Sequence, residues 1–174
     1  QINPSTALIS LQHANSETGV LQNIKLACEI AQKNGVLFHT DAVQSVAKIP
    51  FDLKDYPVDM LSISAHKFNG PKGIGALYLK KGTSSLFSPV CGGSQEKKRR
   101  GGTENVAGIY GFGKACELVK SRMNEKSEIA ELTEYFYNRI CEIIPGAELF
   151  GDKKDRLPNT LNLGFEGVEG DTLL

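Results

Sequence analysis

Lys67 is the residue of this chain best suited to covalent chemistry. It follows Ser64 and His66 at the point where an apolar stretch, residues 60–64, runs into a turn rich in glycine and proline. A lysine amine held beside hydrogen-bond donors at a strand end suits chemistry on a carbonyl group. A lone lysine in a glycine-rich turn is more often an ordinary surface residue, so the rest of the chain must decide between these two interpretations.

Polar residues also follow the first two apolar stretches of the chain. Asn15 and Ser16 follow the first, and Asp41 and Gln44 follow the second. Ligands of open parallel sheets bind outside the carboxyl ends of the strands, so we expect these side chains to converge with Lys67. Asp41 and Gln44 are three residues apart, and they project to one side if the chain turns helically there.

These residue types together match the needs of pyridoxal 5'-phosphate (PLP), which uses a Schiff-base lysine, an aspartate on its ring nitrogen and donors for its phosphate. A carboxylate such as Asp41 would keep the ring nitrogen protonated, because a nearby opposite charge raises the pKa of that nitrogen. Ser64 and His66 are two apart on a predicted strand end and would share a face. Singly, each residue also has a structural interpretation: Asp41 as a helix N-cap, His66 as a structural histidine and Gln44 as a surface residue.

A strand, helix, strand unit is predicted to position this chemistry. Strands are predicted over 7–12 and 36–40, both buried, and a helix over 23–34 whose apolar residues recur at helical spacing. Short joins between these elements predict a right-handed crossover and a parallel sheet. The later predicted elements are strands 60–64 and 75–80, an optional strand 86–90, helices 105–123 and 128–144, strands 147–150 and 160–165, and a helical turn from 171.

The composition indicates a folded protein that recognises its ligands through a site. With 40% hydrophobic residues, the 174-residue chain can bury a core, and its 20 basic and 20 acidic residues give no argument for nucleic acid or an anionic membrane.

No apolar run approaches transmembrane length, and the start does not resemble a signal peptide. The basic run 97–100 is by default a solvated loop. We predict reduced, mostly buried thiols and no metal site for the four widely spaced cysteines, which are Cys28, Cys91, Cys116 and Cys141.

Four motifs follow one another in an order that is typical of one family. They are His-Thr-Asp-Ala-Val-Gln at 39–44, Ser-Ile-Ser-Ala-His-Lys-Phe-Asn-Gly-Pro-Lys-Gly-Ile-Gly-Ala-Leu-Tyr at 62–78, Gly-Gly-Ser-Gln-Glu at 92–96 and Arg-Gly-Gly-Thr-Glu-Asn at 100–105. In these motifs the chain strongly resembles cysteine desulfurases of the NifS/IscS type, within the class-V aminotransferase group of fold-type-I PLP enzymes. The resemblance runs over the whole chain and implies a piece of a protein somewhat more than twice as long.

The resemblance implies a role for each residue of the strand ends. Lys67 is implied to be the lysine that forms the internal aldimine with PLP, and Asp41 to pair with the pyridine nitrogen. Gln44 is implied to approach the ring hydroxyl. Ser64 and His66 are implied to hold the phosphate.

A residue outside the strand ends is also implied to bind the cofactor. Thr103 is expected to reach the phosphate of the partner subunit, which predicts a homodimer with shared active sites and places the basic run 97–100 beside such a site.

The family usually carries two asparagines where this chain has Asn15 and Ser16. Ser16 occupies the position that contacts the cofactor ring, and Asn15 is the alternative. Gly102 stands where the family often has Ser.

The implied fold is an α/β fold-type-I PLP-dependent transferase. Residues 1–115 are expected to form the second half of the PLP-binding large domain, with a mainly parallel sheet, and 116–174 to begin the small α+β C-terminal domain. The resemblance also implies that the ring-stacking histidine and the nucleophilic cysteine lie outside this chain, and none of the four cysteines here fits that nucleophile. The chain alone is therefore expected to be inactive.

The implied activity converts L-cysteine to L-alanine and leaves its sulfur as an enzyme-bound persulfide. The implied setting is the cytoplasm, where a sulfur-acceptor or scaffold protein would pass the sulfur to iron–sulfur cluster or thiolation pathways; no nucleic acid or membrane partner is expected. Another class-V enzyme, such as an aminotransferase or a selenocysteine- or kynurenine-cleaving lyase, would use the same Asp41, Gln44 and Lys67. A non-catalytic domain with a structural role is the remaining alternative.

Overall fold

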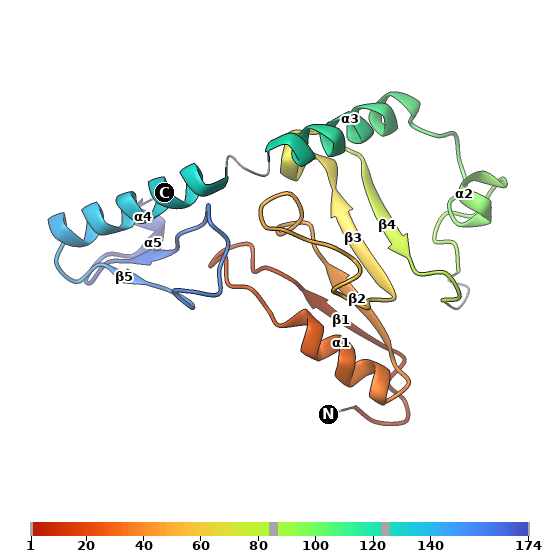
Figure 1. The fold of residues 1–174 in the computed structure, drawn as a ribbon, viewed down its shortest axis with the longest axis horizontal. Coiled ribbons are helices and arrows are strands. Elements are labelled where there is room, and N and C mark those ends of the chain that lie inside the picture. The colour runs from red at the N-terminus through yellow and green to blue at the C-terminus, as the bar shows by residue number, and fades with distance from the viewer. Residues whose placement is uncertain (1, 84–86, 123–125, 174) are drawn as a thin grey trace.

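The computed structural model describes residues 2–83, 87–122 and 126–173, which form a four-stranded sheet, a two-stranded sheet and the helices around them (Figure 1). The strands are β1 (Leu8–Gln12), β2 (Leu37–Asp41), β3 (Met60–Ser64), β4 (Gly75–Leu79), β5 (Glu148–Leu149) and β6 (Leu163–Gly164). The helices are α1 (Ile24–Lys33), the 3₁₀ helix η1 (Ala65–Phe68), α2 (Gln95–Lys98), α3 (Val106–Arg122), α4 (Lys126–Ile143) and α5 (Gly170–Leu173).

The large sheet has the order β1-β2-β3-β4, and its first three strands are parallel. This confirms the predicted parallel sheet. β4 pairs antiparallel with β3, and the connection between them consists of the 3₁₀ helix η1 and the turn that follows it. No strand is assigned over 87–90, and the remainder of the optional strand 86–90 lies outside the described residues.

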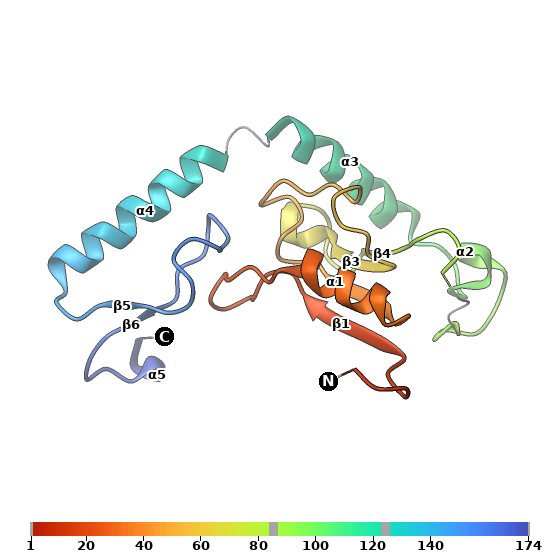
Figure 2. The same ribbon diagram turned by 60° about the horizontal axis from the view of Figure 1, so that its bottom comes forward.

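Helix α1 covers one face of this sheet (Figure 2). Its first turn is capped by Asn23, whose Oδ1 accepts a hydrogen bond from the backbone nitrogen of Leu26 at 3.0 Å. Ile24, Cys28 and Ala31 are buried against Phe38 of β2. The opposite face carries no such helix within the described residues. The prediction that the first strand is buried is therefore wrong, since every second residue of β1 is exposed.

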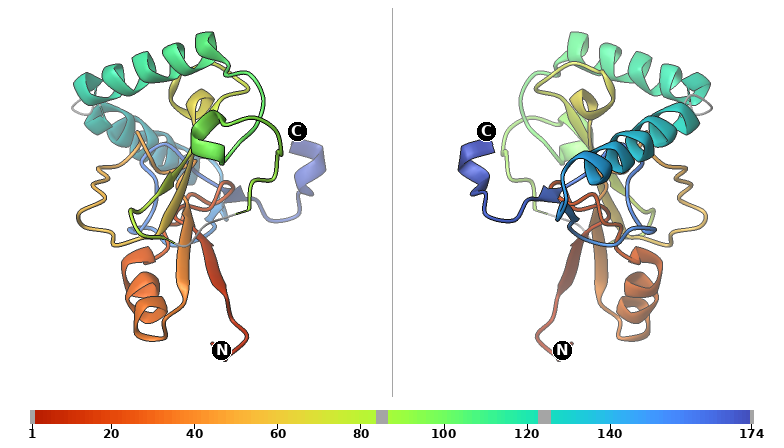
Figure 3. Two further views of the ribbon diagram at one scale, coloured as in Figure 1. Left: turned by 90° about the vertical axis from the view of Figure 1, so that its right-hand side faces the viewer. Right: turned by 90° about the vertical axis from the view of Figure 1, so that its left-hand side faces the viewer.

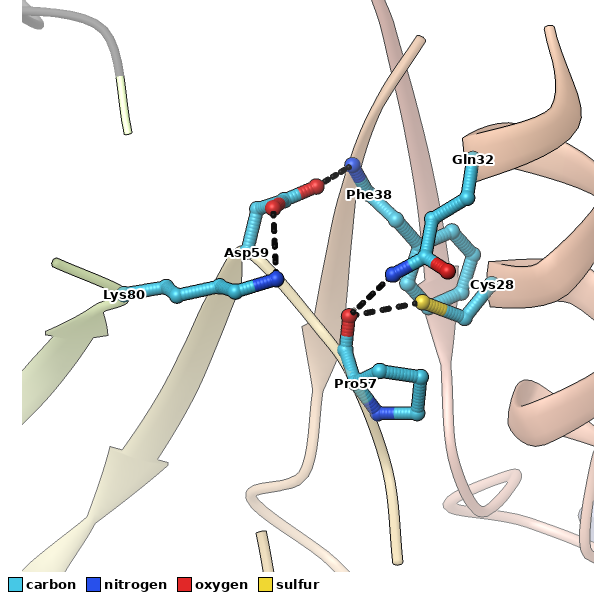
Figure 4. Close-up of polar contacts among 6 residues, drawn as sticks. All are labelled: Cys28, Gln32, Phe38, Pro57, Asp59 and Lys80. Carbon is cyan, nitrogen blue, oxygen red and sulfur yellow. Dashed lines mark hydrogen bonds and ion pairs between the residues drawn. The ribbon is translucent and has the colours of Figure 1, made fainter. Parts of the chain in front are cut away.

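Polar contacts just before β3 connect this part of the chain to α1, to β2 and to Lys80, which follows β4 (Figure 4). The Asp59 carboxylate accepts a hydrogen bond from the backbone nitrogen of Phe38 at 3.0 Å and lies 3.9 Å from the ammonium of Lys80. The carbonyl of Pro57 accepts hydrogen bonds from the Cys28 thiol at 3.0 Å and from the Gln32 amide at 3.1 Å. The amino ends of the parallel strands are thus fixed, which leaves the carboxyl ends free for a site.

Helix α3 packs over η1 through a second, smaller core. The Phe68 and Phe112 rings are 5.6 Å apart, and Ala65 and Ala115 are buried beside them.

The helix presents these residues toward η1, so Cys116, one position further round the helix, faces outward. The prediction of mostly buried thiols is therefore wrong. All four cysteines are free and only Cys28 is buried.

Residues 152–160, called here the docking segment, connect the β5–β6 part of the chain to the loop 13–21 after β1. Arg156 Nη2 donates hydrogen bonds to the carbonyls of Thr18 at 2.8 Å and Thr160 at 2.7 Å. Gly19 has a φ of +76°, and a Cβ placed there would be 2.8 Å from the Cβ of Thr160. Glycine is therefore required for this close approach.

The two parts of the chain meet beneath α3 and α4, which are inclined to each other above the two sheets (Figures 2 and 3). The division into domains 1–115 and 116–174 stays a prediction; residue 115 falls within the helix α3. No described helix is both long enough and apolar enough to cross a membrane.

Candidate functional site

The carboxyl ends of β1, β2 and β3 lie side by side, as the strand pattern predicts. Asp41 is in register with Gln12 on one side and with Ser62 on the other. The backbone continues this alignment past the strands, because the nitrogen of His13 donates to the carbonyl of Asp41 at 2.8 Å. The loops that follow the three strands therefore start from one edge of the sheet.

Asp41 is exposed at this edge and shapes the turn that follows it. Its Oδ1 accepts a hydrogen bond from the backbone nitrogen of Val43 at 2.9 Å, but residues 42–50 form turns and no helix, so the interpretation of Asp41 as a helix N-cap is wrong. The other carboxylate oxygen has no protein donor among the described residues. This oxygen is available to a cationic group above the sheet.

Lys48 lies between Gln44 and Lys67, and the sequence analysis missed it. Lys48 Nζ donates a hydrogen bond to Gln44 Oε1 at 2.9 Å, and Lys48 and Lys67 line one pocket. Burial and the neighbouring charge of Lys67 lower the pKa of Lys48. The signal in the sequence is only the spacing of four from Gln44, which by itself is common on any helical turn.

The pocket beside Lys67 has a volume of about 310 Å³. Lys67 enters it from η1, so it comes one turn after β3 and not from the strand itself. Two amines and two amides line the pocket together with apolar side chains, and no acidic residue does. Its lining is Ala47, Lys48, Lys67, Phe68, Asn69, Ala115, Leu118, Val119, Ile129, Pro158 and Asn159.

Ser64 and His66 form a hydrogen-bonded pair at the end of β3. Ser64 Oγ lies 2.8 Å from His66 Nδ1. The prediction that both belong to a strand end is wrong for His66, because the chain turns into η1 after Ser64. The tight turn nevertheless keeps the two polar atoms together. One atom of the pair donates to the other, so a neutral pair keeps one N–H or O–H for an anion.

The loop after β1 places Asn15 and Ser16 in different roles. Asn15 Oδ1 accepts hydrogen bonds from the backbone nitrogens of Glu17 and Thr18, both at 2.9 Å. Its carbonyl oxygen therefore shapes the loop, and only its amide nitrogen stays available to a ligand. Ser16 is exposed and makes no side-chain hydrogen bond within the described residues.

Thr103 is not brought together with Lys67 in this chain. It is exposed in the segment that joins α2 to α3 and does not line the pocket beside Lys67. Its carbonyl accepts a hydrogen bond from Arg100 Nη1 at 3.3 Å. The basic run 97–100 before it is exposed, and Lys97 and Lys98 have positive φ angles of 56° and 64°.

Two histidines near the strand ends also escaped the sequence analysis. His39 on β2 bonds to Ser10 Oγ through Nδ1 and to Ser62 Oγ through Nε2, each at 2.8 Å, which makes a polar row across three strands. His13 is buried, with Nδ1 at 2.9 Å from Ser45 Oγ. Burial lowers the pKa of both rings, and the nearby Asp41 opposes this for His39.

The residues present fit PLP. The Lys67 amine makes no ion pair within the described ranges, and Asp41 keeps one carboxylate oxygen without a protein donor. A free amine, a carboxylate, an amide end and a hydroxyl–imidazole pair together match the lysine, ring and phosphate contacts that the cofactor needs. Within the described residues, no group of three or more His, Cys, Asp or Glu residues is placed to hold a metal ion.

Comparison with known proteins identifies close sequence relatives over the whole chain. The family described as aminotransferase class-V matches residues 1–174. The cysteine desulfurase IscS of Dictyoglomus turgidum is 48% identical over 170 residues, which cover 97% of this chain and 43% of that protein. A cysteine desulfurase of Klebsiella pneumoniae is 46% identical over 174 residues, which cover 99% of this chain and 43% of that protein. The resemblance drawn from the motifs is thereby confirmed.

Solved structures agree with these relatives. A NifS-like protein superposes with a TM-score of 0.91 at 36% identity, covering 99% of this chain and 47% of that one. A NifS-like protein from Rickettsia africae gives the same TM-score at 34% identity, covering 99% and 48%. The chain therefore spans less than half the length of the relatives and structures that it matches.

Proposed function

Because the chain belongs to the class-V aminotransferase family, we propose that it is part of a PLP-dependent cysteine desulfurase. The observation that carries this proposal is that Asp41, Gln44 and Lys67 all lie at or just after the carboxyl ends of neighbouring parallel strands, in a chain whose relatives bear that name. The reaction converts L-cysteine to L-alanine and moves the substrate sulfur onto an enzyme thiol as a persulfide. Within this chain, Cys28 is unsuited to be that thiol, because it is buried and its pKa is raised.

When bound, PLP supplies an electron-withdrawing ring to an amino acid joined through its amine. The chain's own residues would hold it from several sides. The free oxygen of Asp41 keeps the proton on the ring nitrogen, and the Gln44 amide binds the ring oxygen. Ser64 and His66 bind the phosphate through their hydroxyl and imidazole groups.

Lys67 has two roles in this proposal. Its Nζ anchors the cofactor, and after exchange with the substrate amine it carries protons to and from the substrate. No acidic residue lines the pocket beside it, so no carboxylate of the pocket wall competes for the amine. Asn15 or Ser16 contacts the ring from the loop after β1.

We further propose that two copies form a homodimer with shared active sites. Thr103 is exposed and does not line the pocket of Lys67 in its own chain, which supports a role at the phosphate of the partner subunit. The exposed basic run 97–100 would border that shared site. The protein would work in the cytoplasm and deliver sulfur to an acceptor or scaffold protein for iron–sulfur cluster assembly or thiolation.

The proposal is tested with the complete gene product, loaded with PLP and supplied with L-cysteine. Alanine and persulfide or sulfide are expected in equal amounts. The Lys67→Ala variant is expected to lose about 10³-fold or more of this activity, because both the anchor and the proton carrier are removed. Lys114→Ala is the matched control, since Lys114 is exposed on α3 and paired only with Glu117. Full activity in Lys67→Ala, or no alanine from the wild-type protein, would contradict the proposal.

A further inference from the structure

Lys48 occupies an unusual position for a lysine. It is half-buried in the turn after β2, close to Gln44 and Lys67. The turn is tight: the nitrogen of Val46 donates to the carbonyl of Ala42 at 3.0 Å, and Ala47 has a φ of +70°. A left-handed alanine is strained, so other contacts of the turn must offset this conformation.

The ammonium of Lys48 has no carboxylate partner among the described residues. The ion pairs of residues 2–83, 87–122 and 126–173 involve Lys80, Lys114 and Arg139 instead. Burial and the charge of Lys67 both act against the charged form and lower the pKa of Lys48. A lysine that served only the fold would be better placed in water or beside an acid. Its one side-chain hydrogen bond among the described residues is to the carbonyl oxygen of Gln44.

This contact determines which way the Gln44 amide faces. An ammonium can only donate hydrogen bonds, so the atom that it touches must be the amide oxygen Oε1. The amide nitrogen Nε2 then lies at the other end, and both of its N–H groups lack acceptors within the described residues. Two free N–H donors suit an oxygen that carries negative charge. With the amide reversed, the same position would offer a lone pair and would repel such an oxygen.

We propose that Lys48 is a positioning residue that holds the Gln44 amide with Nε2 toward the ring oxygen of the cofactor. This rests on the proposed function, because it requires PLP beside Lys67. The ring oxygen is negatively charged when the cofactor is joined to a lysine, and it shares a proton with the lysine nitrogen. A hydrogen-bond donor at that oxygen stabilises the form without this proton, so it lowers the pKa of the proton. Loss of the ammonium frees the amide to rotate and weakens this donor.

The test compares Lys48→Met with Lys48→Arg in the complete gene product loaded with PLP. Lys48→Met is expected to bind PLP about tenfold more weakly and to shift the pH midpoint of the bound cofactor's visible absorbance upward by about one unit. Lys48→Arg is expected to stay near the wild-type values, because a guanidinium also only donates. Binding is measured by fluorescence titration, and the circular dichroism melt of each variant shows that it has folded.

A double variant separates an effect through Gln44 from a direct charge effect. If Lys48 acts through the amide, Lys48→Met added to Gln44→Ala leaves the absorbance midpoint of Gln44→Ala unchanged. An equal shift in both backgrounds would overturn the proposal, and so would a Lys48→Met protein that titrates like the wild type. A wild-type protein that takes up no PLP would overturn the proposed function, and this proposal with it.

Discussion

At the scale of single residues, the site depends on small sets of polar atoms that the fold leaves unoccupied. The Lys67 amine, one oxygen of Asp41 and the amide nitrogen of Gln44 have no protein partner among the described residues, whereas Asn15 uses its oxygen to build its own loop. Residues with free polar atoms are candidates for ligand contact. Residues whose polar atoms are already paired are candidates for structure.

His13 provides a pH prediction at this scale. Burial lowers its pKa below the usual value of 6.5, so the folded state binds fewer protons than the unfolded state in the window below pH 6.5. Stability is then greatest above pH 6.5 and falls as the pH drops through that value, by up to about 1.4 kcal/mol per pH unit for one proton. The urea midpoint measured between pH 8 and pH 5 is expected to decrease accordingly.

The variant that tests this is His13→Gln. It is expected to give a shallower pH dependence, although not a flat one, because burial also lowers the pKa of His39. If His13→Gln and the wild type show the same slope, His13 is not the group that titrates.

Residue types and their positions in the sequence were sufficient to select most residues of the proposed site. They did not predict the hydrogen bonds between those side chains and their neighbours. A carboxylate, an amide and a lysine after three apolar stretches are visible in the sequence as polar positions at strand ends. The Lys48–Gln44 contact and the row Ser10, His39 and Ser62 depend on side-chain directions and on the register between strands. Spacing along one segment does not contain that information.

At the scale of elements, periodicity and turn residues predicted most helices and strands to within one or two residues. The helix predicted over 23–34 is Ile24–Lys33, and the strand predicted over 60–64 is Met60–Ser64. The docking segment was not predicted, because Arg156 bonds a carbonyl 138 residues away. Its guanidinium binds backbone carbonyls, which every residue has. The sequence therefore gives no sign of which carbonyls Arg156 contacts.

The docking segment gives a prediction at this scale. Arg156→Gln is expected to lose the hydrogen bonds to Thr18 and Thr160 and to weaken the attachment of the segment by about 1.5–3 kcal/mol. Limited proteolysis is then expected to cut loop 13–21 and residues 152–160 faster than in the wild type. Arg139→Gln is the matched control, because Arg139 pairs only with Glu142 on the exposed surface of α4. Equal cleavage rates in both variants would contradict the docking role.

At the scale of the whole molecule, the fold class predicted from the sequence is confirmed. β1, β2 and β3 form a parallel sheet with α1 on one face, and the NifS-like structures superpose on 99% of the chain. This α/β fold of the fold-type-I PLP enzymes places ligands at the carboxyl ends of its strands. The location of the proposed site therefore follows from the fold, and its chemistry follows from the residues.

One face of the sheet and the apolar side chains of α4 remain uncovered in the described residues. Leu132, Tyr135 and Phe136 are exposed on α4, and Leu8 is exposed on β1. Sequence periodicity predicted these elements correctly but could not tell which of their faces the described chain covers. For this reason the buried strand and the buried thiols were wrong expectations, although the elements that carry them were predicted.

The most direct test of the account is to find the residue that holds PLP covalently in the complete gene product. Borohydride reduction of the loaded protein, followed by peptide mass spectrometry, is predicted to locate the reduced cofactor on Lys67 alone. The visible absorbance of the bound cofactor is predicted to disappear in Lys67→Ala. A reduced cofactor on Lys48 or another lysine, or a Lys67→Ala protein with unchanged absorbance, would contradict the account.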